Sequence, residues 1–206
     1  MRFHGDLRIG DSIRRVSRIA DVTAKEGRTG RLCFVTVDHL MEVKGSPQVR
    51  ERQDIVYREL TPTKEMTPAK ETAPANETTP TNEKTWPQPA DAGRHQRRIE
   101  PTSALLFRYS ALTFNSHRIH YDRRYAVDVE GYPGLVVHGP LQATLLFNFA
   151  TEVRGAAPER FTFRSMSPLF DDCEFLLHAS EEGEALRLWT ARRGGPVAMT
   201  AEANFA

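Results

Sequence analysis

A tandem repeat near the middle of the chain cannot form regular secondary structure. Four six-residue units run from residue 61 to residue 84 and read TPTKEM, TPAKET, APANET and TPTNEK. Each unit has proline in second place, and a proline at every sixth position excludes both an α-helix and a central β-strand. No position carries a recurrent apolar side chain that could build a solenoid core. We therefore predict a disordered linker over residues 61–96, between an N-terminal part at 1–60 and a C-terminal part at 97–206.

The bulk properties of the 206 residues exclude several classes of partner. A net charge of +1 produces no long-range field, which argues against nucleic acid as the main partner. No apolar run approaches the roughly 18 residues that span a bilayer, and the start, MRFHGDLRIGD, lacks the apolar core of a signal peptide. Cys33 and Cys173 have neither metal nor redox spacing. These features predict a cytoplasmic protein with buried, reduced thiols and no membrane partner.

The N-terminal part is rich in valine, isoleucine and phenylalanine. Three such segments, Ile13–Ile19, Leu32–Val43 and Val49–Leu60, are separated by turn-forming residues at 25–30 and 44–47. Apolar and polar side chains alternate in the middle segment, as expected of a strand with one wetter face. The sequence predicts a three-stranded meander without a helix. A sheet of this size needs an apolar partner, so we do not expect it to be a free-standing domain.

The C-terminal part combines one long helix with several strands. Ser103–Tyr109 is predicted as a strand and Pro140–Val153 as a helix, with proline in its first turn and Gly155 at its end. That helix is apolar over most of its circumference, so it should be buried. Four further strands are predicted: Phe161–Met166, Cys173–Ala179, Ala185–Ala191 and Val197–Phe205. The order predicts an α+β fold in which a curved antiparallel sheet wraps a buried helix, and the N-terminal meander reads as an incomplete first copy of it.

Polar, titratable side chains gather before the predicted long helix. Asn115, His117, His120 and Asp122 lie within eight residues. A metal site would need a third ligand at a fixed offset, and there is no cysteine cluster, so we predict no metal. The histidines either hold an irregular loop through hydrogen bonds or transfer protons near neutral pH.

Gly139 adds an electrophilic element to this stretch. It precedes Pro140 at the predicted start of the buried helix, where the backbone N–H stands at the positive end of the helix dipole. With no side chain to keep a substrate away, this N–H could stabilise a developing oxyanion and polarise a thioester carbonyl. Together, the histidines and Gly139 favour acid–base chemistry on an acyl thioester.

At this point the sequence resembles a known family. The motifs SALTFNSHRIHYD and EGYPGLVVHGPL, within residues 109–141, are similar to those of MaoC-like, R-specific enoyl-thioester hydratases and dehydratases of the hotdog fold. Within that group, the motifs are similar to those of the type 2 hydroxyacyl-thioester dehydratases, and the mesaconyl-C4-CoA and itaconyl-CoA hydratases are similar too. The resemblance implies a double hotdog fold and a hydro-lyase that needs no cofactor. It also implies an acyl-CoA or acyl carrier protein thioester as substrate, of the enoyl or 3-hydroxyacyl kind, including short dicarboxylic acyl-CoA.

The resemblance also implies residue roles. His120 falls on the catalytic histidine of the family motif, and Gly139 on the glycine whose amide binds the thioester oxygen. Asn115 stands where the family has aspartate, His117 where it has asparagine, and Arg118 where it has proline. An asparagine can position a water molecule but cannot accept its proton at neutral pH. We therefore expect His120 to transfer protons and Asn115 to hold the water.

Three points stay open at the level of the sequence. The second acid–base group is either absent or supplied by His117 or Asp122. Arginines 118, 123 and 124 either bind the substrate's anionic groups or are solvated surface charges. The protein could also be an acyl-thioester binding protein without turnover, or a thioesterase, and we expect it to form a homo-oligomer. Candidate substrate-binding residues are Arg118, Tyr132, Gly134 and His138, and for His138 the sequence favours a structural role.

Overall fold

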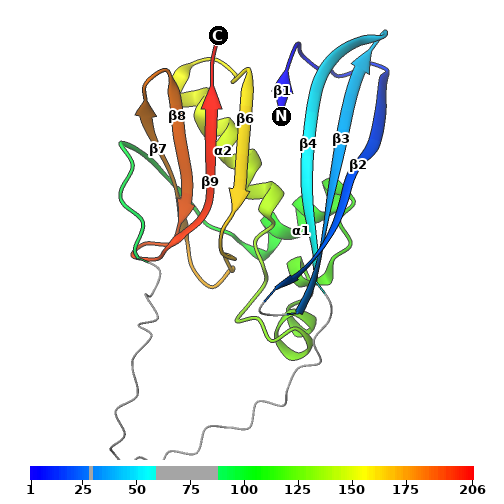
Figure 1. The fold of residues 1–206 in the computed structure, drawn as a ribbon. Helices are drawn as coiled ribbons and strands as arrows, with labels where there is room; N and C mark the ends of the chain where they lie inside the picture. Colours follow the sequence, from blue (N-terminus) through cyan, green and yellow to red (C-terminus); the bar gives the residue numbers. More distant parts are fainter. Residues whose placement is uncertain (28–29, 59–87) are drawn as a thin grey trace, which may run out of the picture. The chain divides into compact units, whose positions relative to one another are not determined.

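The chain divides into two units in the computed structural model (Figure 1). The structure describes residues 1–27, 30–58 and 88–206. Of these, residues 4–27 and 30–58 form the N-terminal unit, while residues 1–3 and 88–206 form the C-terminal unit. The repeat that the sequence predicts to be a linker lies outside the described residues.

The N-terminal unit is an antiparallel meander of β2 (Ile13–Gly27), β3 (Gly30–Val43) and β4 (Ser46–Arg58). Its central strand pairs with both neighbours, so that Val35 lies opposite Val22 on β2 and opposite Ile55 on β4. The three predicted strands are confirmed, although β2 extends well beyond its predicted end. No helix occurs in the described part of this unit.

The C-terminal unit contains an antiparallel sheet with the strand order β1-β6-β9-β8-β7-β5. The three strands β7, β8 and β9 form a second meander, and β1 joins the sheet beside β6 (Figure 1). The four strands predicted after the long helix are confirmed, with ends shifted by a few residues. The strands of this sheet are β1 (Arg2–Phe3), β5 (His95–Ile99), β6 (Arg160–Ser165), β7 (Phe175–Glu182), β8 (Ala185–Ala191) and β9 (Val197–Asn204).

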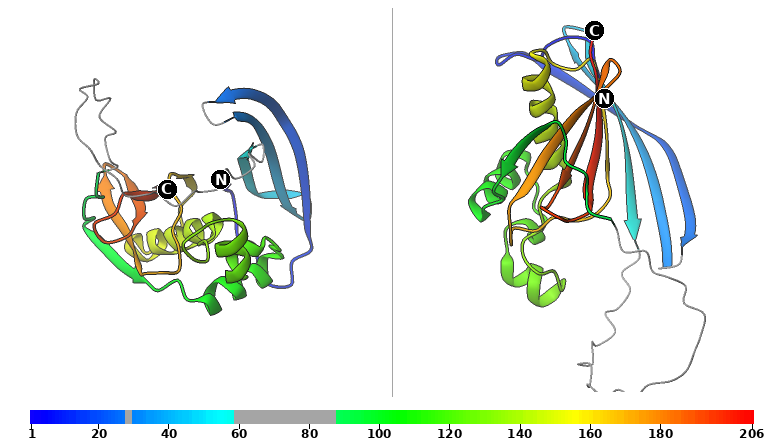
Figure 2. Two further views of the ribbon diagram at one scale, coloured as in Figure 1. Left: turned by 90° about the horizontal axis from the view of Figure 1, so that it is seen from below. Right: turned by 90° about the vertical axis from the view of Figure 1, so that its left-hand side faces the viewer.

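Helix α2 (Gly139–Arg154) lies along one face of this sheet (Figures 1 and 2). Its buried side chains recur at helical spacing, as in Leu146 and Ala150, and they pack against strand residues such as Leu188 and Met199. The helix ends at Arg154 and is capped by Gly155, which adopts φ 76° and donates its N–H to the Thr151 carbonyl. The predicted buried helix and the α+β architecture are therefore confirmed.

Residues 103–113 form helix α1 (Ser103–Thr113), so the strand predicted at 103–109 is wrong. Thr102 accepts a hydrogen bond from the Leu105 N–H at 3.2 Å and caps the first turn. The buried residues Leu106 and Ser110 are four apart, which is the spacing of one helix face. A short apolar run fits either structure, and the cap decides between them here.

The C-terminal unit begins earlier than predicted. Strand β5 starts at His95, inside the segment 61–96 that the sequence predicts as linker. The Ala90 N–H donates to the Gly195 carbonyl at 2.8 Å, and the Trp189 indole donates to the Asp91 carbonyl at 3.1 Å. Residues 90–96 therefore pack on the C-terminal unit. Within the described ranges, no helix combines the length and the apolar content needed to cross a bilayer, and the two cysteines are half-buried.

Candidate active site

The segment that connects α1 to α2 carries the predicted site residues. It includes a 3-10 turn at Arg118–His120 and a π-helical turn at Tyr125–Val129. Both turns lie in the C-terminal unit, ahead of the extended residues that lead into α2. The chain therefore returns from the end of one helix to the start of the next, and brings residues 16 to 28 positions apart into contact.

His120 is buried and its tautomer is set by one hydrogen bond. His120 is only 8% exposed, and its Nδ1 lies 2.7 Å from the Val136 carbonyl oxygen. A carbonyl can only accept, so Nδ1 carries the proton and Nε2 keeps a free lone pair. Burial lowers the pKa of His120 below 6.5, the Val136 hydrogen bond works against this, and the nearby His117 lowers the pKa further. His120 is therefore neutral at pH 7 and can accept a proton at Nε2.

His138 stacks face to face on His120. The ring centroids are 3.7 Å apart and the planes meet at 16°. His138 is fully buried, and its Nε2 lies 2.8 Å from the Ser110 hydroxyl on α1. Burial, followed by the proximity of His120, lowers the pKa of His138 to about 4. Among the described residues its Nδ1 has no hydrogen-bond partner. His138 is thus a neutral, buried ring between α1 and His120, which fits the structural role that the sequence favours, and its role in substrate binding stays a prediction.

Gly139 is the first residue of α2, immediately after His138. The residue is half-buried, and Pro140 occupies the next position. A Cβ atom at Gly139 would lie 3.3 Å from the Ser165 hydroxyl and 3.9 Å from the Met199 methyl group. A side chain at this position would therefore be crowded against Ser165. Gly139 has the location and the bare backbone that the sequence predicted for an oxyanion donor.

Asn115 and His117 form a local turn beside His120. The Asn115 side-chain oxygen accepts the His117 N–H at 3.0 Å, and the Asn115 N–H donates to the Ser110 carbonyl at 2.9 Å. This geometry leaves the Asn115 side-chain amide free to donate. The His117 ring is exposed and meets the His120 ring edge-on at 5.6 Å between centroids. The structure thus brings His117 next to His120.

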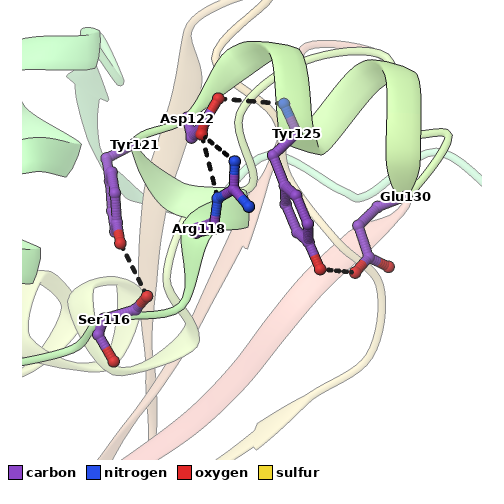
Figure 3. A network of polar contacts seen from close by, with 6 residues as sticks. All are labelled: Ser116, Arg118, Tyr121, Asp122, Tyr125 and Glu130. Carbon is purple, nitrogen blue, oxygen red and sulfur yellow. Dashed lines mark hydrogen bonds and ion pairs between the residues drawn. The ribbon is translucent and has the colours of Figure 1, made fainter.

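Asp122 and Arg118 are paired with each other (Figure 3). The Arg118 guanidinium donates twice to one Asp122 oxygen, at 2.7 and 3.1 Å, and lies 4.2 Å above the Tyr125 ring. The other Asp122 oxygen accepts the Tyr125 N–H at 3.1 Å. The hydrogen bonds from Arg118 and from the Tyr125 backbone hold the pKa of Asp122 below its usual value. This carboxylate is committed to stabilising the loop, which makes it a poor acid–base group.

Further contacts complete this polar network. The Tyr121 hydroxyl donates to the Ser116 carbonyl at 2.8 Å, and the Tyr125 hydroxyl donates to Glu130 at 2.9 Å (Figure 3). The network ties the two short turns together on the exposed side of the segment. It leaves Arg118 engaged with neighbours in its own loop.

The other two predicted substrate-binding residues shape the chain before α2. Tyr132 packs on Phe170, with 5.9 Å between ring centroids, and its N–H donates to the Ala126 carbonyl at 2.9 Å. A Cβ atom at Gly134 would come within 2.7 Å of an Asp171 carboxylate oxygen. Gly134 therefore allows Asp171 to approach the backbone closely. In the part of the chain that the structure describes, three or more histidine, cysteine or acidic side chains are nowhere grouped as metal ligands.

Three partners of these residues are absent from the sequence-based prediction. Ser110 lies in α1, one residue after the segment that was wrongly predicted as a strand, and the helical spacing of its neighbours was the available signal. The Val136 carbonyl and Asp171 carry no local signal, because each contacts a residue at least 16 positions away. Arg123, predicted as a surface or substrate-binding residue, pairs with Asp171.

The profile of the family described as "Hydroxyacyl-thioester dehydratase type 2" matches residues 1–171. The chain belongs to this family. It is 44% identical to the mesaconyl-C(4)-CoA hydratase of Chloroflexus aurantiacus over 201 residues, which is 98% of this chain and 66% of that protein. It is also 38% identical over 102 residues to the mitochondrial hydroxyacyl-thioester dehydratase type 2 of Schizosaccharomyces pombe, covering 48% and 33% of the two chains. The chain thus spans less than two thirds of the length of these relatives.

Solved structures agree with the hotdog fold of the family. All of this chain aligns with 72% of HtdX from Mycobacterium tuberculosis, with a TM-score of 0.67 at 18% identity. It also aligns with 69% of a MaoC-like dehydratase from Phytophthora capsici, with a TM-score of 0.68 at 15% identity. A second M. tuberculosis protein, described as having a double hotdog fold, aligns over 98% of this chain and 71% of its own, with a TM-score of 0.57 at 15% identity. The predicted hotdog class is confirmed.

Proposed function

We propose that this member of the type 2 hydroxyacyl-thioester dehydratase family is a hydro-lyase acting on CoA thioesters. It would add water to an enoyl-CoA and, in reverse, remove water from a 3-hydroxyacyl-CoA. The observation that carries the proposal is the His120 tautomer: Nδ1 donates to the Val136 carbonyl, so Nε2 is available as a base. The 44% identity to a mesaconyl-C(4)-CoA hydratase supports a short dicarboxylic acyl group as substrate.

In the proposed hydration, His120 transfers the proton and Gly139 stabilises charge. Nε2 of His120 takes a proton from water while the water oxygen bonds to the β-carbon of the enoyl thioester. The electron pair of the double bond moves toward the thioester carbonyl, whose oxygen accepts the Gly139 N–H at the positive end of α2. The resulting imidazolium then returns its proton to the α-carbon. One molecule of water is added, and the enzyme is left as it began.

The neighbours of His120 fit a mechanism with a single proton-transferring residue. The Val136 carbonyl accepts the Nδ1–H throughout, and it stabilises the imidazolium that forms. Asn115 is a donor rather than a base, so we assign it to holding the water through its free side-chain amide. Asp122 is bound to Arg118, and we assign that pair to the stability of the loop. A second acid–base group is not needed when the same histidine removes and returns the proton.

The direct test is to incubate the protein with mesaconyl-C4-CoA, itaconyl-CoA and crotonyl-CoA and to follow the enoyl thioester absorbance. We expect absorbance to fall with the dicarboxylic substrates without release of free thiol. Release of thiol would identify a thioesterase instead. Binding of the thioesters without any change in absorbance would identify a binding protein, and would contradict the proposal.

The same assay with thioesters carried on acyl carrier protein separates the two carriers. We expect CoA thioesters to be turned over, because the relative at 44% identity is named for a CoA substrate. We also propose that the protein forms a homo-oligomer, which sedimentation of the purified chain would test.

A further inference from the structure

Asp171 is a buried carboxylate on the connection between β6 and β7. Its side chain is only 3% exposed. One oxygen accepts the Leu135 N–H at 2.8 Å and an Arg123 N–H at 3.2 Å, and the other oxygen is paired with Arg123. A carboxylate at such a position is costly unless it is paired and hydrogen-bonded, and these contacts meet both conditions. No chemical step proposed above uses this residue.

The backbone of Asp171 binds the same segment as its side chain. The Asp171 N–H donates to the Leu135 carbonyl at 3.0 Å, and the Val137 N–H donates to the Leu169 carbonyl at 2.8 Å. Between them, Val136 pairs with Phe170 as in an antiparallel sheet. Residues 135–137 are therefore held along one edge by the chain at 169–171.

The other edge of residues 135–137 faces His120. The Val136 N–H donates to the Ile119 carbonyl at 3.0 Å, and the Val136 carbonyl accepts the His120 Nδ1–H at 2.7 Å. Two residues beyond Val137 stands Gly139, the first residue of α2. The segment thus connects the proposed base to the proposed oxyanion donor.

Arg123 closes these contacts into a ring. It follows His120 by three residues and reaches across to the Asp171 carboxylate. From His120 the ring runs through Arg123, Asp171 and Leu135 to Val136, and returns to His120 through the Nδ1 hydrogen bond. Each step of this ring is either a short segment of the polypeptide chain or a polar contact, and all of them lie within the C-terminal unit.

We propose that Asp171 is a positioning residue, which with Arg123 holds the Val136 carbonyl in place and so fixes the tautomer of His120. The proposal rests on the function proposed above for its kinetic consequences, but the tautomer itself can be observed without turnover. The same arrangement explains why residue 134 is a glycine, since a Cβ atom there would displace the Asp171 carboxylate.

The test compares three variants with a neighbouring ion pair. Arg123→Gln leaves the buried carboxylate without its cation, Asp171→Asn keeps an acceptor for the Leu135 N–H, and the third variant combines both changes. The matched control is Asp172→Asn. Asp172 is adjacent in sequence and pairs with Arg192 at 2.9 Å, but among the described residues it forms neither a hydrogen bond nor an ion pair with residues 134–137.

We expect Arg123→Gln to lower kcat by about 10-fold or more while KM changes by less than about 3-fold, since the reacting groups are misplaced rather than lost. The double variant should be more active than Arg123→Gln alone, because removing the unpaired charge relieves the defect. Asp172→Asn should match the wild type. Strictly additive effects of the two substitutions, or equal activity of Asp171→Asn and Asp172→Asn, would overturn the proposal.

A second readout is independent of turnover. Histidine ¹⁵N spectra of the full chain should show His120 protonated on Nδ1 in the wild type and in Asp172→Asn. In Arg123→Gln they should show a mixture of the two neutral tautomers. An unchanged His120 tautomer in Arg123→Gln would contradict the positioning role, even if the protein had no hydratase activity. Conversely, an inactive wild type with the expected tautomer change would reject the proposed function and leave the positioning role intact.

Discussion

The C-terminal unit contains two buried histidine stacks that share most of their physical properties. His120 stacks on His138 with 3.7 Å between centroids and 16° between planes, and His178 stacks on Trp189 with 5.3 Å and 13°. All three histidines are buried, and burial is the main cause that lowers the pKa of each. Burial, stacking and a lowered pKa therefore do not distinguish a proposed catalytic histidine from a structural one.

The difference lies in the hydrogen bond at Nδ1. In His120 this atom donates to the Val136 carbonyl, which leaves a lone pair on Nε2. In His178 it accepts the Gly93 N–H at 3.2 Å, so the proton of the neutral ring is on Nε2. In His120 the lone pair on Nε2 is available to accept a proton, whereas in His178 the lone pair on Nδ1 accepts a hydrogen bond that anchors the chain before β5. The direction of one hydrogen bond assigns the two roles.

The largest effect should follow from His120→Ala. We expect kcat for the preferred enoyl-CoA to fall by about 10²- to 10⁴-fold, because the proton-transferring group is removed. Steady-state kinetics on folded protein, checked by circular dichroism, would measure it. His178→Ala is the matched control, and it should retain kcat within about 3-fold because it touches no reacting group. Comparable losses in both variants would remove the distinction between the stacks.

His138 should make stability depend on pH. Its pKa is about 4 in the folded state, against 6.5 for an unperturbed imidazole, so the unfolded chain binds a proton as pH falls below 6.5 and the folded chain does not. This group therefore costs stability between pH 6.5 and about 4, and nothing above that range. Urea unfolding at pH 7 and pH 4 should show that the wild type loses ~3 kcal/mol more than His138→Gln. Parallel losses would mean that His138 is protonated in the folded protein.

A smaller effect on stability is expected from His178→Ala. The substitution leaves the buried Gly93 N–H without its acceptor and removes the stack on Trp189. We expect the free energy of unfolding at pH 7 to fall by about 1–3 kcal/mol. Chemical denaturation measures this value, and no change would show that another acceptor replaces the imidazole.

The smallest effect should come from His117→Ala. This ring is exposed and meets His120 only at its edge, so we expect kcat to change by less than about 3-fold at pH 7. Removing it also removes a charge that lowers the pKa of His120. The acid limb of the kcat/KM profile should therefore move to higher pH, toward 6.5. A loss as large as that of His120→Ala would instead make His117 the second acid–base group.

The sequence predicted much of the fold where the relevant signals are local. Alternation of apolar and polar side chains located the strands, and the helix at 140–153 was found because its apolar residues recur every three to four positions. The strand predicted at 103–109 is wrong because a short apolar run has no decisive period, and the Thr102 cap was not recognised. The predicted end of the linker at residue 96 also lies too far along the chain, because no local pattern in residues 90–96 indicates their contacts with the sheet.

The candidate site was predicted in part. The motif predicted His120, Asn115 and Gly139 as catalytic residues, and these roles stay proposals. The motif could not reveal that Asp122 is bound to Arg118, since residues four apart face each other only once the local turn has formed. It also gave no indication of Asp171, which lies 48 residues beyond Arg123.

By itself, the amino-acid sequence determined the elements whose cause is local: the proline-interrupted repeat, the strands, the buried helix and the glycine at its start. Only the tertiary structure decided which nitrogen of each histidine carries the proton. That choice depends on whether a carbonyl or an N–H faces Nδ1, and the partner comes from 16 residues away for His120 and 85 residues away for His178. Such contacts form when distant segments pack together, so no local pattern of residues encodes them.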